Sequence, residues 1–320
     1  MEKTGKRMAV MVGCNYPNTK NELHGCINDV LAMREVLVHR FGFEKTNITV
    51  LTDQDLSSSA NPDLLPTGAN IKRVLHEMVE AAEPGDVLFF HYSGHGTRIP
   101  SLKPGHVFRQ DEAIVPCDFN LITDVDFRQL VNKLPKGTSF TILSDSCHSG
   151  GLIDKEKEQI GPSSTLLSAK SLQQNYSISP KTIPVQAVLQ HLTSLTNIHT
   201  SDIGTHLLEL FGSEASIRFV DPLLVGSSDD EGILLSGCQA NETSADINPT
   251  TAAGEGGRKA YGAFSNAVEK VLKENPGALS NKQVVGLARE VLKGQGFGNQ
   301  HPCLYCSDKN ADVAFLCQWT

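Results

Sequence analysis

Short apolar runs alternate with amphipathic segments along the first half of the chain. Runs of apolar and β-branched residues predict buried parallel strands at residues 9–13, 48–52, 86–92 and 139–145. Apolar residues spaced three and four apart predict helices over 28–41, 70–82 and 124–134. Strands that alternate with helices indicate an α/β fold with a mostly parallel sheet.

The pattern changes after about residue 155. Residues 156–182 are polar, rich in Ser and Gln and interrupted by Pro and Gly, which is typical of a mobile linker. Helical periodicity returns at 185–195 and 201–212, and later segments predict strands at 233–237 and 303–306 and helices at 260–272 and 281–292. We therefore expect an ordered block over 1–155, an insert over 156–229 and a second block over 230–320.

Composition narrows the class of protein. A chain of 320 residues, 39% hydrophobic and 20% charged, can bury a large core as a soluble protein. A formal net charge of −8 argues against nucleic acid or an anionic membrane as partner. The apolar run 8–12 is too short for a secretory signal, and no run could span a bilayer, so the cytoplasm is the default compartment. The eight cysteines are spread along the chain, which favours reduced thiols.

Two predicted strands end in residues that carry chemistry. The first runs into Ser93-Gly94-His95-Gly96, and the second ends at Asp145, two residues before Cys147. Neighbouring parallel strands would bring an imidazole and a thiol together, which is the minimum for thiolate attack on an acyl carbon. Taken singly, Cys147 could be a structural thiol and His95 a loop residue. Their separation of 147 − 95 = 52 positions matches the general caspase pattern of about 50 and favours catalysis.

Five segments carry a family resemblance. They read GCNYPNTKNELHGCINDV, YSGHGT, DEAIVPCDFNLITD, DSCHSGG and SGCQANETSAD in this order. The chain resembles metacaspases, and its long insert between two blocks resembles the plant type II group. The resemblance implies a caspase-like fold in which the two blocks, p20-like and p10-like, form one domain. It also implies a cysteine endopeptidase.

The resemblance assigns roles to residues. His95 and Cys147 match the catalytic dyad, and the N–H groups of Gly96 and Cys147 would form the oxyanion hole. The positions that match the pocket for the residue at the cut (S1) are Cys26, Asp29, Ser93 and Asp145. Two carboxylates in a pocket would favour Arg, then Lys, at the cut.

The resemblance also implies synthesis as a zymogen that is activated by self-cleavage in the insert. Lysines are available there at 155, 157, 170 and 181. Lys181, in Ser179-Pro180-Lys181-Thr182, sits where the family cuts itself, so we expect the cut after Lys181.

Calcium is the cofactor that the resemblance brings into question. Asp111, Asp124 and Asp154 match acidic positions of calcium-dependent relatives, which commonly have a further aspartate where this chain has Val125. Because calcium takes six to eight oxygen ligands, we expect a calcium-independent enzyme without a cofactor. The resemblance also implies an acidic working pH.

Two rival functions remain open. The first is a caspase that cuts after Asp, although an acidic pocket would repel that side chain. The second is a catalytically silent caspase-like scaffold, against which the intact dyad weighs. Expected partners are protein and peptide substrates with Arg or Lys at the cut, and protein inhibitors. We expect a monomer, and the resemblance extends the compartments to nucleus and extracellular space. A role in regulated cell death or peptide maturation is implied by the resemblance alone.

Overall fold

A seven-stranded sheet forms the centre of the molecule. The computed structural model describes residues 5–54, 61–100, 110–147, 152, 157–161, 176–221, 232–239, 242–249 and 259–317. The strand order is β2 (Ile48–Thr52), β1 (Arg7–Gly13), β3 (Val87–Ser93), β7 (Ser139–Asp145), β10 (Gly232–Ser236), β13 (Cys303–Tyr305) and β8 (Glu158–Ile160). All pairs from β2 to β10 are parallel, whereas β13 is antiparallel to both of its neighbours. The predicted mostly parallel sheet is confirmed.

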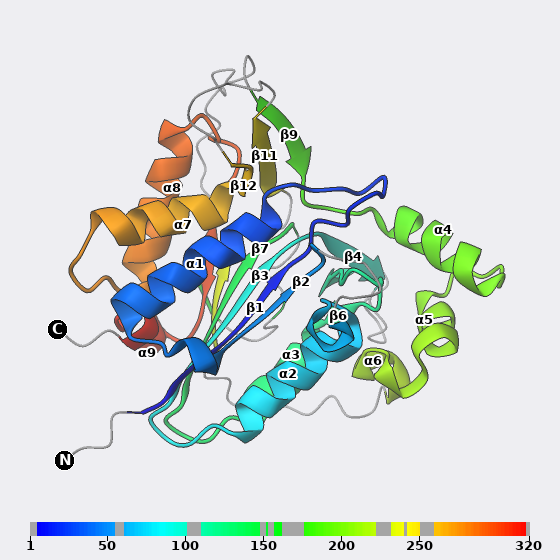
Figure 1. Ribbon diagram of the computed structural model, residues 1–320, viewed down its shortest axis with the longest axis horizontal. Coiled ribbons are helices and arrows are strands. Elements are labelled where there is room, and N and C mark those ends of the chain that lie inside the picture. Colours follow the sequence, from blue (N-terminus) through cyan, green and yellow to red (C-terminus); the bar gives the residue numbers. More distant parts are fainter. Residues whose placement is uncertain are drawn as a thin grey trace.

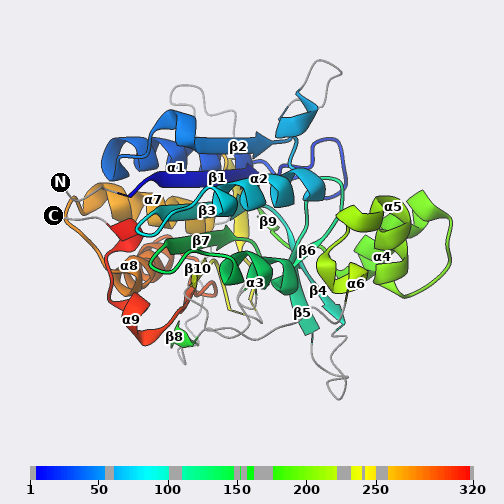
Figure 2. The same ribbon diagram turned by 90° about the horizontal axis from the view of Figure 1, so that it is seen from below.

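Helices cover both faces of this sheet (Figures 1 and 2). On one face lie α1 (Cys26–Phe41), α7 (Ala263–Glu274) and α8 (Asn281–Gly294), and on the other lie α2 (Gly68–Glu80) and α3 (Asp124–Asn132). Successive residues of β3 point to opposite faces. Phe89 therefore joins the core beneath α1 and α7, whereas Leu88 and Phe90 join the core beneath α2 and α3. A short helix α9 (Asp308–Ala311) follows β13.

Two small sheets flank the ends of the central strands. One consists of β4 (Gly96–Pro100), β5 (Gln110–Ile114) and β6 (Ile122–Thr123), and the other of β12 (Tyr261–Gly262), β11 (Ala245–Pro249) and β9 (Tyr176–Pro180). The sequence pattern did not predict these strands. They are short, and β9 finds its partner β11 far along the chain, so no local periodicity marks it.

Residues 176–221 of the insert are folded. They form α4 (Val185–Thr196), α5 (Ile203–Phe211) and α6 (Ile217–Val220), which pack beside β4 and β6 around a separate apolar core (Figure 2). The predicted helices at 185–195 and 201–212 are confirmed within a few residues at their ends. The expected mobile linker over 156–182 differs at its end, because residues 176–180 form β9.

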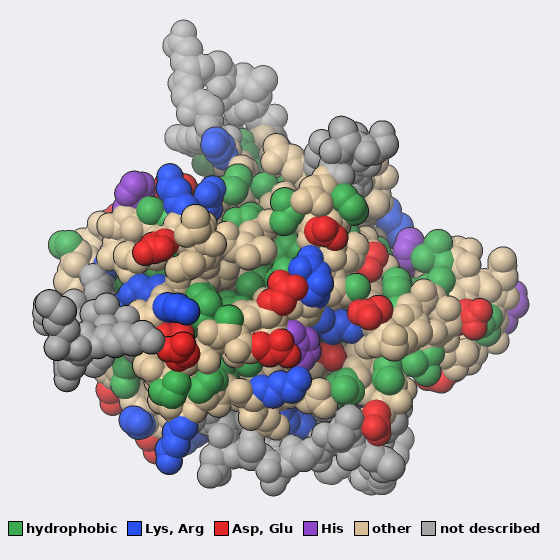
Figure 3. All heavy atoms as spheres, turned by 60° about the horizontal axis from the view of Figure 1, so that its bottom comes forward, with side chains coloured by type: hydrophobic (Ala, Val, Ile, Leu, Met, Phe, Trp, Pro, Cys, Tyr) green, Lys and Arg blue, Asp and Glu red, His purple; other side chains and the backbone are tan. Residues whose placement is uncertain are grey.

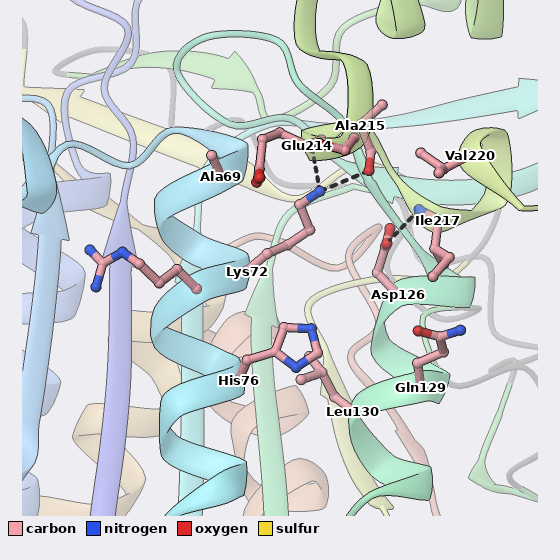
Figure 4. A pocket seen from close by; sticks show the side chains of 12 residues that line it. Ala69, Lys72, His76, Asp126, Gln129, Leu130, Glu214, Ala215, Ile217 and Val220 are labelled. Atoms are coloured by element: carbon pink, nitrogen blue, oxygen red, sulfur yellow. Dashed lines mark hydrogen bonds between the residues drawn. The ribbon is translucent and has the colours of Figure 1, made fainter.

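Main-chain carbonyls and a carboxylate fasten the insert to the catalytic block. Lys72 of α2 donates to the carbonyls of Glu214 and Ala215, the latter at 2.9 Å (Figure 4). Asp126 of α3 accepts from the Ser216 hydroxyl at 2.5 Å and from the Ile217 N–H at 3.0 Å. Residues 214–217 are thus held at several points on the α2–α3 face.

Among the described residues, no helix combines the length and the apolar character needed to span a bilayer.

Candidate active site

The site lies where β3 and β7 end side by side. Ser93 pairs with Asp145 in the parallel register, and each strand is followed two residues later by a candidate catalytic residue, His95 or Cys147. The two loops come so close that a Cβ on Gly96 would collide with the Cys147 carbonyl oxygen. The geometry therefore needs glycine at position 96.

His95 is held as a neutral base. Its Nε2 donates to the Asn21 carbonyl at 2.8 Å, so the neutral ring carries its proton there and leaves Nδ1 with a lone pair. Nδ1 is buried and, among the described residues, has no hydrogen-bond partner. The pKa of His95 is lowered to about 4, mainly by burial and in smaller part by the charge of Lys181, while the hydrogen bond to the Asn21 carbonyl opposes this fall. The imidazole is therefore neutral and ready to accept a proton.

The loop before α1 orients this histidine. The Tyr16 ring packs against the His95 ring at 4.8 Å between centroids, and the Tyr16 hydroxyl accepts the His95 N–H at 2.9 Å. Asp53, just after β2, accepts the N–H groups of Asn15 and Tyr16 at 2.8 and 2.7 Å. Sequence reasoning missed these roles of Tyr16, Asn21 and Asp53. The first two lie in the segment that carried the resemblance, and this was the available signal.

Cys147 faces the p10-like block. Its Sγ accepts the Ser244 N–H at 3.0 Å. The Cys147 N–H and the Gly96 N–H both donate to the same oxygen, the carbonyl of Lys181, each at 3.1 Å. The two predicted oxyanion-hole donors thus converge on one carbonyl, at the separation that such donors need.

The four predicted pocket residues also lie together. Lys181 extends into the pocket, where its Nζ lies 3.1 Å from Asp145 Oδ2 and 3.4 Å from Asp29 Oδ2, and donates to Ser93 Oγ at 2.8 Å. Ser93 Oγ in turn donates to Asp29 Oδ2 at 2.7 Å. Cys26 is fully buried at the start of α1, where burial raises the pKa of its thiol and the charge of Lys181 opposes this rise.

Burial and charge compete in this pocket. Burial raises the pKa of Asp29 to about 7, although the charge of Lys181 opposes the rise. For Lys181, burial alone would lower the pKa, but Asp145 and its acidic neighbours outweigh burial and hold the pKa well above its usual value. Lys181 is therefore a buried ammonium ion that its carboxylate partners stabilise.

Gly262 forms one wall of the pocket. Its N–H donates to Asp29 Oδ1 at 2.8 Å, and a Cβ at this position would collide with Lys181 Nζ and with both pocket carboxylates. Ser265, three residues later along the chain, donates its N–H to Asp145 Oδ2 at 2.9 Å. Sequence reasoning did not identify these residues, because their main-chain atoms make the contacts.

The chain around Lys181 runs through the site as an added strand. Residues 176–180 pair with β11, and the Lys181 N–H donates to the Ser244 carbonyl at 2.9 Å. Beyond it, Thr182 bridges to Gly96, and the Ile183 N–H donates to the Gly96 carbonyl at 3.0 Å. Lys181 is fully buried, whereas a lysine in a mobile linker would be exposed. The difference arises from β11 and the pocket, which order this segment.

Comparison with known proteins identifies the family. Residues 7–156 match the model described as metacaspase, peptidase C14 domain. The chain is 62% identical to metacaspase-9 of Arabidopsis thaliana, over 98% of this chain and 97% of that protein. It is 37% identical to Arabidopsis metacaspase-6, over 97% of this chain and all of that protein. The chain belongs to the metacaspases. It is therefore a cysteine-type endopeptidase with a caspase-like fold.

A solved structure supports the architecture of this metacaspase. The protein GSU0716 of Geobacter sulfurreducens superposes with a TM-score of 0.61, over 96% of this chain and 97% of that chain. The sequences are only 18% identical, so the likeness concerns the fold alone.

Two of the three acidic residues that match positions of calcium-dependent relatives pair with arginines in this metacaspase. Asp111 forms a buried ion pair with Arg218 of α6 at 2.5 Å, and Asp124 pairs with Arg128 one helical turn later at 3.1 Å. Val125 is buried, and Asp154 lies outside the described residues, as do Lys155 and Lys170. The described parts of the chain hold no group of three or more His, Cys, Asp or Glu side chains suited to a metal.

Proposed function

We propose that this metacaspase hydrolyses peptide bonds after Arg or Lys, that it is made as a zymogen and that it activates itself by cutting after Lys181. One observation carries the proposal: the Lys181 side chain fills the acidic pocket while its carbonyl accepts from Gly96 and Cys147. This is how the residue before a scissile bond would be bound. Lys157, another lysine of the insert, instead makes an exposed ion pair with Asp308.

The proposed mechanism follows from these contacts. His95 Nδ1 takes the proton of Cys147, and the thiolate attacks the Lys181 carbonyl carbon. The negative charge that develops on the carbonyl oxygen is stabilised by the N–H groups of Gly96 and Cys147. His95 then returns the proton to the Thr182 nitrogen, the C–N bond breaks, and a thioester remains. Water, deprotonated by His95, hydrolyses the thioester and regenerates the thiol.

The pocket supports Arg as the preferred residue at the cut. Asp145 Oδ1 is buried and has no hydrogen-bond partner among the described residues, so it remains available as an acceptor. A guanidinium has five N–H donors and could use this oxygen in addition to those that an ammonium contacts. An Asp side chain would meet two buried carboxylates, which argues against a caspase-like preference.

Calcium independence is part of the proposal. The guanidinium groups of Arg218 and Arg128 supply the positive charge that a cation would bring to Asp111 and Asp124. Titrating calcium into the purified enzyme tests this; strong activation from a silent baseline would contradict it. A role in regulated cell death or peptide maturation rests on the family resemblance.

Peptide cleavage tests the central proposal. The wild type and Cys147→Ala should be compared on fluorogenic peptides that end in Arg, Lys or Asp, with and without calcium, at mildly acidic and at neutral pH. Arg and Lys cleavage by the wild type only, with intact mass showing fragments 1–181 and 182–320, would support it. Cleavage after Asp would overturn the pocket assignment. Absence of any cleavage would favour the scaffold.

A further inference from the structure

A third carboxylate, which the mechanism above does not use, lies beside the pocket. Asp246 of β11 is only 1% exposed. Its Oδ1 accepts the Gly25 N–H at 2.9 Å, and its Oδ2 accepts the His24 N–H at 2.9 Å. Both donors are neutral, and among the described residues no Lys or Arg forms an ion pair with Asp246.

Asp246 fixes the start of α1, the helix that carries two of the pocket residues. The residue before α1 is Gly25, which offers no capping side chain, so Asp246 supplies a carboxylate from another element. A Cβ at Gly25 would lie 2.6 Å from Asp246 Oδ1, which shows how closely the two elements approach. Cys26 and Asp29 follow in the first turn of the helix, so their positions depend on this contact.

Asp246 also adds negative charge near the bound cation. Its carboxylate is among the groups whose charge raises the pKa of Lys181. On the small sheet, Asp246 pairs with Gly262, the residue whose N–H holds Asp29. Asp29 and Asp145 thus contact the Lys181 ammonium group, and Asp246 acts on it by its charge without contacting it.

We propose that Asp246 is a specificity-determining residue of this pocket, which selects a basic residue at the cut by its charge and by positioning Asp29, without contacting the substrate side chain. The proposal rests on the proposed function. Through Asp246, part of the specificity comes from the p10-like block. The pocket carboxylates Asp29 and Asp145 both come from the p20-like block.

A thermodynamic cycle tests the charge effect without catalysis. In the Cys147→Ala background, Lys181→Met removes the ammonium, and Asp246→Asn removes the negative charge at nearly constant shape. Urea unfolding of the background protein, the two single variants and the double variant gives the coupling free energy between Lys181 and Asp246. We expect the change in the unfolding equilibrium constant of the double variant to differ about tenfold from the product of the two single changes, as for a coupled pair. Effects that multiply to within about twofold would overturn the proposal.

A substrate cycle tests specificity in the active enzyme. Paired peptides ending in Arg or in citrulline, its neutral isostere, give the ratio of kcat/KM. We expect Asp246→Asn to reduce this ratio at least about fivefold, because charge discriminates between the two. Equal losses on both peptides would mean that Asp246 is only structural and would overturn the proposal. If the wild type cleaves neither peptide, the proposed function itself fails, and the unfolding cycle alone decides on Asp246.

Glu242 provides the matched control. It lies in the same segment, and its Oε2 also accepts two main-chain N–H groups, those of Gln239 and His301. Its side chain pairs with His301 and not with the pocket. Glu242→Gln should leave the Arg-to-citrulline ratio unchanged. A change equal to that of Asp246→Asn would show that any carboxylate of this segment acts alike, and would contradict the proposal.

Discussion

His95 shows how a single environment sets both the tautomer and the working range of a side chain. Its Nε2–H is committed to the Asn21 carbonyl, and burial keeps the ring neutral by lowering its pKa to about 4. The neutral base is therefore present above this pKa and is lost as the pH falls through it. The base therefore keeps its neutral form at mildly acidic as well as at neutral pH.

Self-cleavage of the uncut chain should follow this titration, because the site then has the geometry described here. Protonation of Asp29, whose pKa is raised to about 7, changes the charge of the pocket below neutral pH. We expect the protonation of His95 to appear as a separate fall in the rate of cleavage after Lys181 near pH 4. Intact mass over a pH series measures it, with Cys147→Ala as the uncut control. A cleavage rate that shows no fall near pH 4 would contradict the prediction.

Gly262 allows a second prediction at this scale. Gly262→Ala places a methyl group against both pocket carboxylates, where Lys181 Nζ lies. We expect kcat/KM on Arg peptides to fall at least about 100-fold, because the methyl group excludes the basic side chain. Gly277→Ala is the control, since a Cβ there meets nothing within 4 Å. Equal activities of the two variants would show that the pocket is not used.

Residues whose side chains carry chemistry were accessible to sequence reasoning, whereas residues that act through their main chain were not. The side-chain chemistry of His95, Cys147, Asp29 and Asp145 pointed to roles, and the structure places the first two on adjacent loops and the two carboxylates at Lys181. Any residue type could present the carbonyls of Asn21 and Ser244, and any except proline could present the N–H of Ser265. Only the folded backbone shows where such groups point.

Among the elements, the central strands and the long helices followed from their periodicity, because each buries an apolar face of its own. β9 did not. Its sequence, YSISP, is mostly polar and partly exposed, and the strand exists because β11 offers it a free edge. The ordered end of the insert depends in the same way on distant partners, such as Lys72 and Asp126.

The ion pair between α6 and β5 gives a prediction for element stability. Arg218→Met leaves Asp111 buried without its partner, so we expect a loss of about 3 kcal/mol in the free energy of unfolding. Adding Asp111→Asn should recover at least half of the loss, since it removes the buried charge. Urea unfolding measures both variants.

Arg73→Met is the control for this prediction. Arg73 forms an exposed ion pair with Glu77, which contributes at most about 1 kcal/mol. If Arg218→Met costs no more than Arg73→Met, α6 is not held by Asp111. A double variant as unstable as Arg218→Met would instead show that packing of the arginine, and not its charge, fastens the helix.

For the molecule as a whole, the negative charge that matters to the proposed substrate preference is internal. The net charge is −8, yet on the face shown in Figure 3 Lys and Arg side chains lie among Asp and Glu side chains. Asp29 and Asp145 are buried in the pocket. Mobile salt screens buried charges weakly, so the preference for Arg over neutral residues should persist at high ionic strength.

The sheet predicts that the proposed cleavage leaves one particle. A cut after Lys181 places β7 and β8 on the first fragment and β10 and β13 on the second, yet the strand order is β7-β10-β13-β8. The two fragments are therefore interleaved and share one core. We expect them to elute together in size-exclusion chromatography and to separate only in denaturant. Separate elution under native conditions would contradict this arrangement.

β9 remains on the first fragment, paired with β11, and Lys181 follows it directly as the last residue of that fragment. Once the bond is cut, the new carboxyl terminus is a tethered competitor for the pocket. A short tether gives it an effective concentration in the millimolar range, which few protein substrates reach in a cell. After cleavage, the rate at which β9 and Lys181 dissociate from the site would then determine how soon other substrates are cut.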